Sequence, residues 1–341
     1  MGCLRNTGGM AQLPIRTCAF VHSKDVQLGR VDANKMVEAM DVCVGRATLA
    51  LQKPLPGYTP FSLEQMALKF QCMKATVLSV RRTLNPGCED PTTVDALAIA
   101  RLNVEDLYTL CLMFEHPKWV TIYLQDGWRK TYVRHLLQAE ETKHLRRFDQ
   151  HNTVTAPETL DKLRTMIGVT GAQVATIHAV ELGTPMPTGI KREQITRFPL
   201  PSGVIEQLQT GPKRTMLERL YIEYRYLSSF THGLNDAMFF KLLCNALPIV
   251  PHTFSPAERK EMWQREIAER SLTSALLSLA QATAELSALY PADAELRGAA
   301  TKPWDVLADG HLLGQAIWNI RTRKLLGVLD FPPQSPSHSV P

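Results

Sequence analysis

Residues 216–233 have the sequence MLERLYIEYRYLSSFTHG, and the spacing of their side chains decides the fold prediction. Apolar residues recur every three or four positions, at Leu217, Leu220, Tyr224 and Leu227. This is the spacing of a helix face that packs against a core. A second stripe beside it is polar and consists of Glu218, Tyr221, Arg225, Ser228 and His232. Gly233 follows directly and suits the left-handed conformation that ends many helices, so the pattern predicts a helix ending at His232.

Arg225 and His232 are the two residues of the polar stripe that point to chemistry. Seven positions separate them, which is two helical turns less about 20°, so they share a face about 10 Å apart along the axis. At a helix C-terminus the dipole favours a charged imidazole. An arginine can hold phosphate oxygens while a histidine transfers a proton, so the pair predicts a site for a phosphate. In the structural alternative, His232 only ends the helix and Arg225 pairs with Glu218 or Glu105.

The motif Tyr-x-x-x-Tyr-Arg-x-Leu-Ser-x-x-x-His resembles a bacterial family of uncharacterised helical proteins. With one position of slack at the first tyrosine, the matching residues are Tyr221, Tyr224, Arg225, Leu227, Ser228 and His232. That family also carries an earlier helix with Arg-x-x-x-Glu, which Arg101 and Glu105 match. The resemblance covers about residues 90–245. Arg101 and Glu105 share a helical face, and they either form a surface ion pair or line a cleft beneath Arg225 and His232.

A more distant resemblance is to the HEPN ribonucleases, helical domains with an Arg-x(4–6)-His motif. It implies a HEPN-like core, a homodimer whose cleft joins two motifs, and metal-independent RNA cleavage, as in a toxin or defence effector. The catalytic residues are then Arg225 and His232, with support from Tyr221, Ser228, Glu218, Arg101 and Glu105. HEPN enzymes usually carry Asn, Asp or His directly after the arginine, and this chain has Tyr226. The alternative is a non-catalytic binding or regulatory protein in which the Arg–His pair is structural.

The Arg–His spacing by itself does not single out this helix. It also occurs at Arg16–His22, Arg129–His135 and Arg146–His151. Arg129 lies in a stretch that interleaves aromatic and basic side chains, namely Tyr123, Trp128, Arg129, Lys130, Tyr132 and Arg134. Such interleaving serves single-stranded RNA through stacking and phosphate contacts, but it is also typical of a core helix with a solvated basic edge.

The composition is that of an ordinary globular protein. The 341 residues are 45% hydrophobic and 21% charged, which allows one large core or two medium ones. The net charge of +5 permits RNA or another anionic partner without requiring one, and a protein partner stays open. The most apolar windows are interrupted by charges, so we expect no membrane span.

Cysteine spacing and carboxylate–histidine spacing predict neither disulfides nor a metal site. The seven cysteines are scattered, with Cys43, Cys72, Cys111 and Cys244 on apolar helical faces, so they indicate buried thiols in a reducing cytoplasm. A single Glu-x-x-His occurs at Glu141–His144, whereas a di-iron bundle needs two copies and two further carboxylates. Phosphate-binding glycine loops are absent, so we predict no metal and no cofactor.

The periodicity predicts an all-α, multi-helix bundle of about nine to ten helices. The expected helices are 31–53, 62–84, 91–115, 119–145, 157–167, 174–182, 216–233, 234–247, 255–290 and 303–329. Ser62 is expected to cap the second helix, and Pro303 to begin the last one. Residues 183–202 are rich in proline and lead into the motif helix, so they suit a lid or a partner surface.

We expect three regions along the chain. Residues 1–30 form an N-terminal arm, residues 31–330 a single helical domain, and residues 331–341, with four prolines and three serines, a disordered tail. The N-terminus lacks a signal-peptide pattern, so a cytoplasmic location is expected. Translation begins at Met1 or at Met10.

Overall fold

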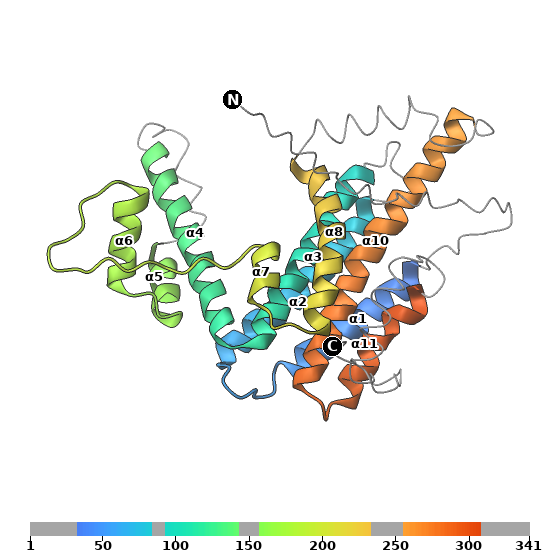
Figure 1. Cartoon of the computed structure of the whole chain (residues 1–341), viewed down its shortest axis with the longest axis horizontal. Coiled ribbons are helices and arrows are strands. Elements are labelled where there is room, and N and C mark those ends of the chain that lie inside the picture. The colour runs from blue at the N-terminus through green and yellow to red at the C-terminus, as the bar shows by residue number, and fades with distance from the viewer. Residues whose placement is uncertain (1–32, 84–92, 143–156, 233–254, 308–341) are drawn as a thin grey trace, which may run out of the picture.

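The structure, a computed structural model, describes residues 33–83, 93–142, 157–232 and 255–307. These residues form ten helices and no strand, which confirms the predicted all-α multi-helix bundle (Figure 1). In chain order the helices are α1 (Ala33–Ala50), α2 (Pro60–Thr83), α3 (Thr93–Glu115), α4 (Lys118–Thr142), α5 (Pro157–Met166), α6 (Gly171–Glu181), α7 (Pro201–Gln207), α8 (Pro212–His232), α10 (Pro256–Leu289) and α11 (Ala294–Leu307). None of these helices is both long and apolar enough to cross a membrane.

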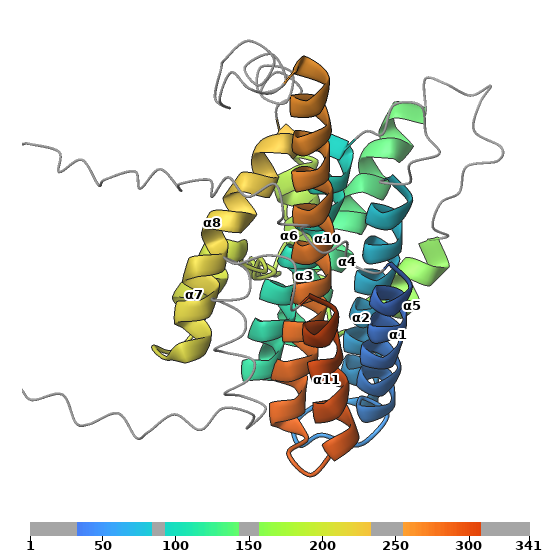
Figure 2. The same cartoon turned by 90° about the vertical axis from the view of Figure 1, so that its right-hand side faces the viewer.

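Helix α10 is the centre of the main bundle. It packs most extensively against α3 and also against α11, α2 and α1. Figure 2 shows α10 and α3 between α8 on one side and α1 and α2 on the other. From residue 271 to residue 287 almost every α10 side chain is buried, including eight polar ones. Four of the hydroxyl groups among them, those of Ser271, Ser278, Thr283 and Ser287, bond to carbonyls about one turn earlier, and Ser274 donates to Glu223 of α8 at 3.1 Å.

A buried amide ties the three innermost helices together. Asn103 of α3 is fully buried, and its Nδ2 donates to the carbonyl oxygens of Met73 on α2 and Ala275 on α10, at 3.1 and 3.0 Å. Both acceptors lie in helices whose backbones already carry their own hydrogen bonds. The amide therefore fixes how far α2 and α10 slide relative to α3.

A smaller lobe stands beside the bundle (Figure 1). Helices α5 and α6 pack on α4 around a second buried cluster formed by Trp128, Leu160, Ile167, Val169, Ile177 and Ile195. Trp128 donates from Nε1 to the Leu160 carbonyl at 2.8 Å and stacks on Tyr132 at 4.7 Å between ring centroids. Helix α4 runs from the bundle into this lobe, so the two cores share one helix.

Two predicted helix starts are wrong. Thr59, not Ser62, caps α2, because its Oγ1 accepts the Ser62 amide at 3.1 Å. The last described helix begins at Ala294, where the Asp293 carboxylate accepts the Leu296 amide at 3.0 Å. It contains Pro303 in its interior. Proline there frees the carbonyl of Ala299 four residues earlier, and the buried Cys43 thiol donates to that oxygen at 3.1 Å.

Other predictions differ from the structure in smaller ways or cannot be compared with it. Cys43 and Cys111 are buried as expected, but Cys72 is exposed, so its predicted burial is wrong. The short helix α7 was not expected. The N-terminal arm, the 234–247 helix, Cys244, the Glu141–His144 pair and the C-terminal tail lie outside the described residues.

Candidate functional site

Helix α8 carries the motif, and it begins four residues before the predicted start at Met216. It runs from Pro212 to His232 as one helix, and His232 is the last residue described before residue 255. Its inner side buries Met216, Leu217, Leu220 and Leu227 in the main core. Its outer side exposes Thr215, Glu218, Arg219, Ile222, Arg225 and Ser229. The apolar stripe therefore holds α8 on the bundle while the opposite face meets solvent.

Arg225 lies on the exposed face of α8. Within the described residues its guanidinium has no ion-pair partner. The two carboxylates expected to neutralise it in the structural alternative are held by other arginines. Glu218 accepts from Arg214 Nε at 2.9 Å, and Glu105 accepts from Arg101 at 2.6 Å. Arg225 thus presents its positive charge to solvent rather than to a neighbouring carboxylate.

The Arg101–Glu105 pair forms as expected on α3, and it meets α8 at Tyr224. Tyr224 Oη donates to Glu105 Oε1 at 3.1 Å, on the same oxygen that takes two bonds from Arg101. The Arg101 guanidinium also lies 5.6 Å from the centroid of the Tyr224 ring, within cation–π range. The network therefore sits against Tyr224, whose side chain faces α3, whereas the neighbouring Arg225 faces solvent.

Aromatic rings extend this network along α8. Tyr221 stacks on Tyr224 at 5.7 Å, and Tyr108 of α3 meets Tyr224 edge-on at 6.2 Å. Tyr108 is buried and donates from its hydroxyl to the Leu217 carbonyl at 2.6 Å, and burial raises its pKa well above the usual value. Burial also raises the pKa of Tyr224, against a hydrogen bond with Ser228 that favours the phenolate. Both phenols are therefore neutral donors at physiological pH.

Ser228 and Tyr226 face into the fold rather than outward. The Ser228 hydroxyl oxygen is buried next to Tyr224. The Tyr226 ring lies 3.7 Å from the Arg270 guanidinium of α10, and Arg270 holds Glu223 through two bonds of 2.9 and 2.6 Å. The position directly after Arg225 is thus a packing contact between α8 and α10.

The first turn of α8 is held by a half-buried lysine. Lys213 Nζ lies 2.5 Å from Glu115 Oε1 at the end of α3 and 3.5 Å from Glu285 Oε2 on α10. Glu285 is almost fully buried and also accepts from Gln281 Nε2 at 2.8 Å. Burial opposes the charge of Lys213, but the two carboxylates outweigh it, so the lysine pKa is raised. This cluster fixes the end of α8 opposite to His232.

The predicted site residues therefore fall into three groups. Arg101, Glu105, Tyr221 and Ser228 gather around Tyr224 in the half-buried seam between α3 and α8. Arg225 and Glu218 lie on the outer face, and nothing beyond the helical backbone of His232 is described. Tyr224 was predicted only as part of the apolar stripe. A signal for its central role is that a tyrosine in such a stripe keeps a hydroxyl that needs a partner once buried.

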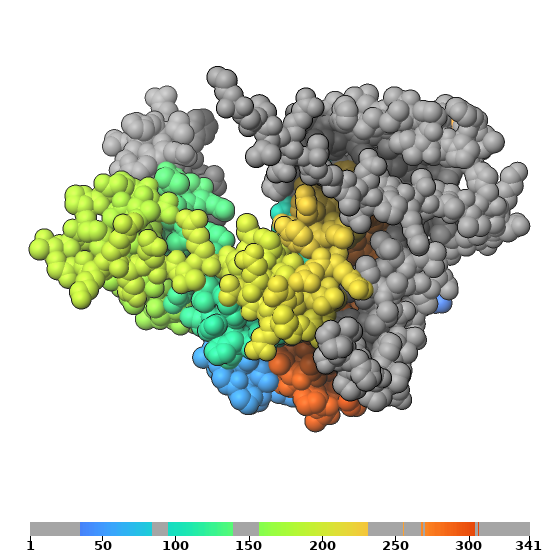
Figure 3. All heavy atoms as spheres, viewed as in Figure 1, coloured from blue at the N-terminus to red at the C-terminus, as the bar shows by residue number. Residues whose placement is uncertain are grey.

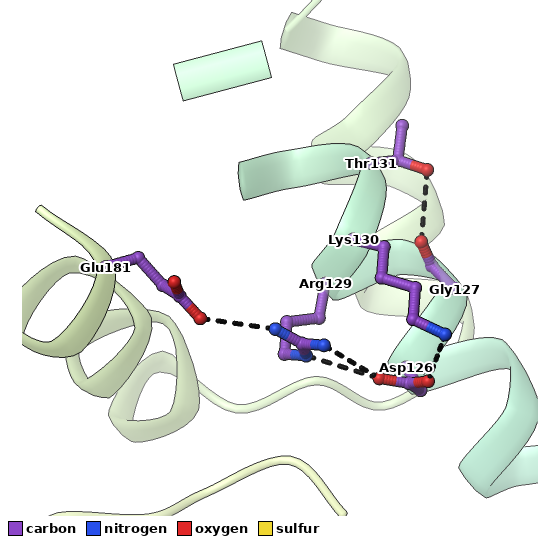
Figure 4. A network of polar contacts seen from close by, with 6 residues as sticks. All are labelled: Asp126, Gly127, Arg129, Lys130, Thr131 and Glu181. Atoms are coloured by element: carbon purple, nitrogen blue, oxygen red, sulfur yellow. Dashed lines mark hydrogen bonds and ion pairs between the residues drawn. The ribbon is translucent and has the colours of Figure 1, made fainter. Parts of the chain in front are cut away.

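Two basic residues of α4, Arg129 and Lys130, form ion pairs within the lobe. Asp126 is 1% exposed, and it accepts from Arg129 at 3.1 Å and pairs with Lys130 at 2.8 Å (Figure 4). Arg129 also reaches Glu181 of α6 at 3.2 Å. This part of α4 buries Trp128 and leaves Lys130 and Arg134 exposed, which agrees with the alternative of a core helix with a solvated basic edge.

Metal-ligating side chains do not gather in the described part of the chain. His178 Nε2 shares a 2.7 Å hydrogen bond with the Tyr132 hydroxyl, and Glu181 is paired with Arg129. No group of three or more His, Cys, Asp or Glu side chains there is placed to hold a metal ion.

No protein-family model, curated protein or solved structure matches this chain.

Proposed function

We propose that this protein is a HEPN-like, metal-independent endoribonuclease in which Arg225 and His232 act on an RNA phosphate. The observation that supports this most directly is the exposed guanidinium of Arg225 on the outer face of α8. Glu218 and Glu105, the carboxylates that would pair with it in the structural alternative, are bound to Arg214 and Arg101. An arginine kept positive and open to solvent is suited to an anionic ligand.

In the proposed reaction the RNA 2′-oxygen attacks the adjacent phosphorus. The new P–O2′ bond forms as the P–O5′ bond breaks, which leaves a 2′,3′-cyclic phosphate and a 5′-hydroxyl. A base takes the proton of the 2′-hydroxyl, and the imidazolium of His232 gives a proton to the departing 5′-oxygen. Arg225 offsets the extra negative charge that develops on the phosphorane.

The seam between α3 and α8 has a positioning role in this proposal. Arg101, Glu105, Tyr221 and Ser228 act through Tyr224 to fix the rotation of α8, and that rotation sets where the Arg225 guanidinium points. Glu218 forms an ion pair with Arg214, so it does not neutralise Arg225. Supporting residues of this kind raise rates by preorganising the groups that touch the substrate.

One histidine does not readily serve as both base and acid in one turnover. We therefore propose a homodimer whose two-fold axis brings the His232 of each copy toward the same RNA. An endoribonuclease built in this way would act on cellular RNA in the cytoplasm, as a toxin or defence effector does.

The experiment is to incubate purified protein with total RNA in EDTA, beside the His232→Ala and Arg225→Ala variants. We expect cleavage by the natural protein and loss of at least a hundredfold in both variants, with cyclic phosphate at the new 3′ ends. The Arg219→Ala variant is the matched control, because Arg219 is another exposed arginine of α8, and it should retain activity. Equal cleavage by all four proteins, or by none, would remove the proposal.

A second candidate is a non-catalytic helical binding or regulatory protein. The observation that favours it is Tyr226, which packs against the Arg270 guanidinium, so the position directly after Arg225 is occupied by a packing side chain. This candidate predicts RNA binding without cleavage. Affinity that depends on Arg225 while RNA stays intact over hours would support it against the nuclease.

A further inference from the structure

We propose that residues 191–200, here called the strap, form a binding surface for the phosphate backbone of single-stranded RNA. The strap has the sequence KREQITRFPL and joins the α4–α6 lobe to α7. Its three basic residues, Lys191, Arg192 and Arg197, are all exposed. This inference takes its ligand class from the proposed function, but it concerns binding rather than cleavage.

The strap is extended chain that is anchored at several points. The Ile195 side chain is buried in the core of the lobe. Phe198 lies edge-on to Trp119 and Tyr123 of α4, at 6.2 and 5.2 Å between ring centroids. The Glu193 amide donates to Thr176 Oγ1 at 3.0 Å. Because the backbone is fixed before any ligand arrives, binding would cost little conformational entropy.

The strap is positive because it carries three basic residues and one carboxylate, and that carboxylate binds outside the strap. Glu193 Oε2 accepts from Thr170 Oγ1 at 2.7 Å, at the N-terminus of α6, where the helix dipole favours a negative charge. None of Lys191, Arg192 and Arg197 has an ion-pair partner in the described part of the chain. By contrast, Arg129 and Lys130 of the same lobe are both paired.

The exposed chemistry of the strap fits a phosphate backbone better than a protein partner. Between residues 191 and 197 the side chains that meet solvent are three basic ones, the polar Gln194 and Thr196, and the acidic Glu193, and the apolar Ile195 is turned inward. The exposed apolar residues nearby, Ile190 and Leu200, are ten positions apart, up to about 33 Å in extended chain. Protein interfaces have an apolar centre, whereas cations spaced along a surface are sufficient to follow a nucleic-acid strand.

The position of the strap connects it with the motif helix. Figure 1 shows the chain crossing α4 and entering α7, and α7 packs against both α3 and α8. Arg214 of α8 donates to the Leu208 carbonyl at the end of α7, at 3.4 Å. In Figure 3 the lobe, α7 and α8 are exposed on one face of the molecule. An RNA strand held by the strap is thereby led toward the outer face of α8.

The test measures binding of a fluorescein-labelled, unstructured 2′-O-methyl RNA of about 20 nucleotides by anisotropy. This RNA has no 2′-hydroxyl, so the reading does not depend on cleavage. The variant is K191E/R192E/R197E, and the control is R82E/R297E/K302E, which reverses three exposed basic residues on α2 and α11. Each reversal changes the charge by two, so both variants go from +5 to −1.

We expect the strap variant to bind at least tenfold more weakly and to reduce the salt slope of log K by about 2, as three lost phosphate contacts require. The control should change affinity less than about threefold. The inference would be overturned if both variants lost affinity equally or if the strap variant lost none. It would also be overturned if the natural protein did not bind this RNA, or if it bound polyglutamate equally tightly. The K191Q/R192Q/R197Q variant repeats the test should the charge reversal unfold the protein. RNA binding that depends on the strap, without any RNA cleavage, would support the strap inference and contradict only the proposed nuclease activity.

Discussion

Tyr224 of α8 donates a hydrogen bond to Glu105 of α3 at 3.1 Å, across 119 positions of the chain. Glu105 is at the same time paired with Arg101, so the phenol completes a three-residue network. The bond sets the rotation of α8 about its own axis, because Tyr224 lies in the middle of the helix. The rotation that turns Tyr224 inward turns Arg225 outward, about 100° further round.

Tyr224→Phe tests this link. Removing the hydroxyl should lower the free energy of unfolding by about 1 kcal/mol, since Glu105 keeps Arg101 but loses one donor. Equilibrium urea unfolding measures the change, and Glu105→Gln with the double variant gives the coupling between the two side chains. Tyr221→Phe is the control, because Tyr221 contributes ring stacking to the site. A coupling near zero would show that the hydrogen bond does not hold α8.

Arg225→Ala separates a solvent-facing role from a structural one. The side chain is exposed and unpaired in the described chain, so its removal should change stability by less than about 0.5 kcal/mol. Leu217→Ala on the buried side of the same helix should cost about 2–5 kcal/mol. Thermal unfolding of both variants provides the comparison. A loss of 2 kcal/mol or more at Arg225 would mean that the guanidinium supports the fold, against the site proposed for it.

Local spacing was sufficient to predict that residues 216–232 form one helix, because its amphipathic stripe carries that information. The Arg101–Glu105 pair was predicted for the same reason, as its members are one turn apart. That Tyr224 would contact the Arg101–Glu105 pair was not predictable from spacing. The contact with Tyr224 depends on how α3 and α8 cross, and no short-range pattern encodes that crossing.

The errors in the prediction have the same origin. Proline is more common at the start of a helix than in its interior, but Pro303 lies inside α11. In this chain the Cys43 thiol donates to the Ala299 carbonyl, which the proline leaves without its usual amide donor. Those two segments are 256 positions apart. Burial of Cys72 was inferred from an apolar neighbourhood in sequence, and the tertiary packing leaves that side exposed. For the site itself, the sequence located the helix and its polar stripe but not which residues of the stripe face inward.

We predict that Lys213 contributes to stability chiefly because Glu285 is buried beside it. In Lys213→Met the Glu285 carboxylate keeps Gln281 but loses its nearby positive charge. We expect a loss of about 2–3 kcal/mol in urea unfolding, reduced from the value for a fully buried pair because Lys213 is 23% exposed. Adding Glu285→Gln should recover at least half of the loss. No recovery in the double variant would mean that Lys213 acts through Glu115 instead.

Alkaline pH should destabilise the protein in part through Tyr58. Burial, with Glu115 nearby, raises the pKa of Tyr58 to about 12, against about 10 in the unfolded chain. Below pH 10 the phenol is protonated in both states and its contribution is complete. Between pH 10 and pH 12 the unfolded chain releases this proton while the folded chain retains it, so the free energy of unfolding falls as pH rises. Solvent screening of the half-buried ring makes this fall modest.

Tyr58→Phe removes that titration together with the 2.8 Å hydrogen bond to the Met113 carbonyl. At pH 9 the variant should be less stable than the natural protein by about 1 kcal/mol, the usual value of such a bond. At pH 11 the gap should narrow, because only the natural protein still carries the ionisation penalty of this phenol. Urea unfolding at the two pH values gives both gaps, and all other titrating groups cancel in the comparison. A gap that stays constant or widens would place the folded pKa of Tyr58 at or below its ordinary value.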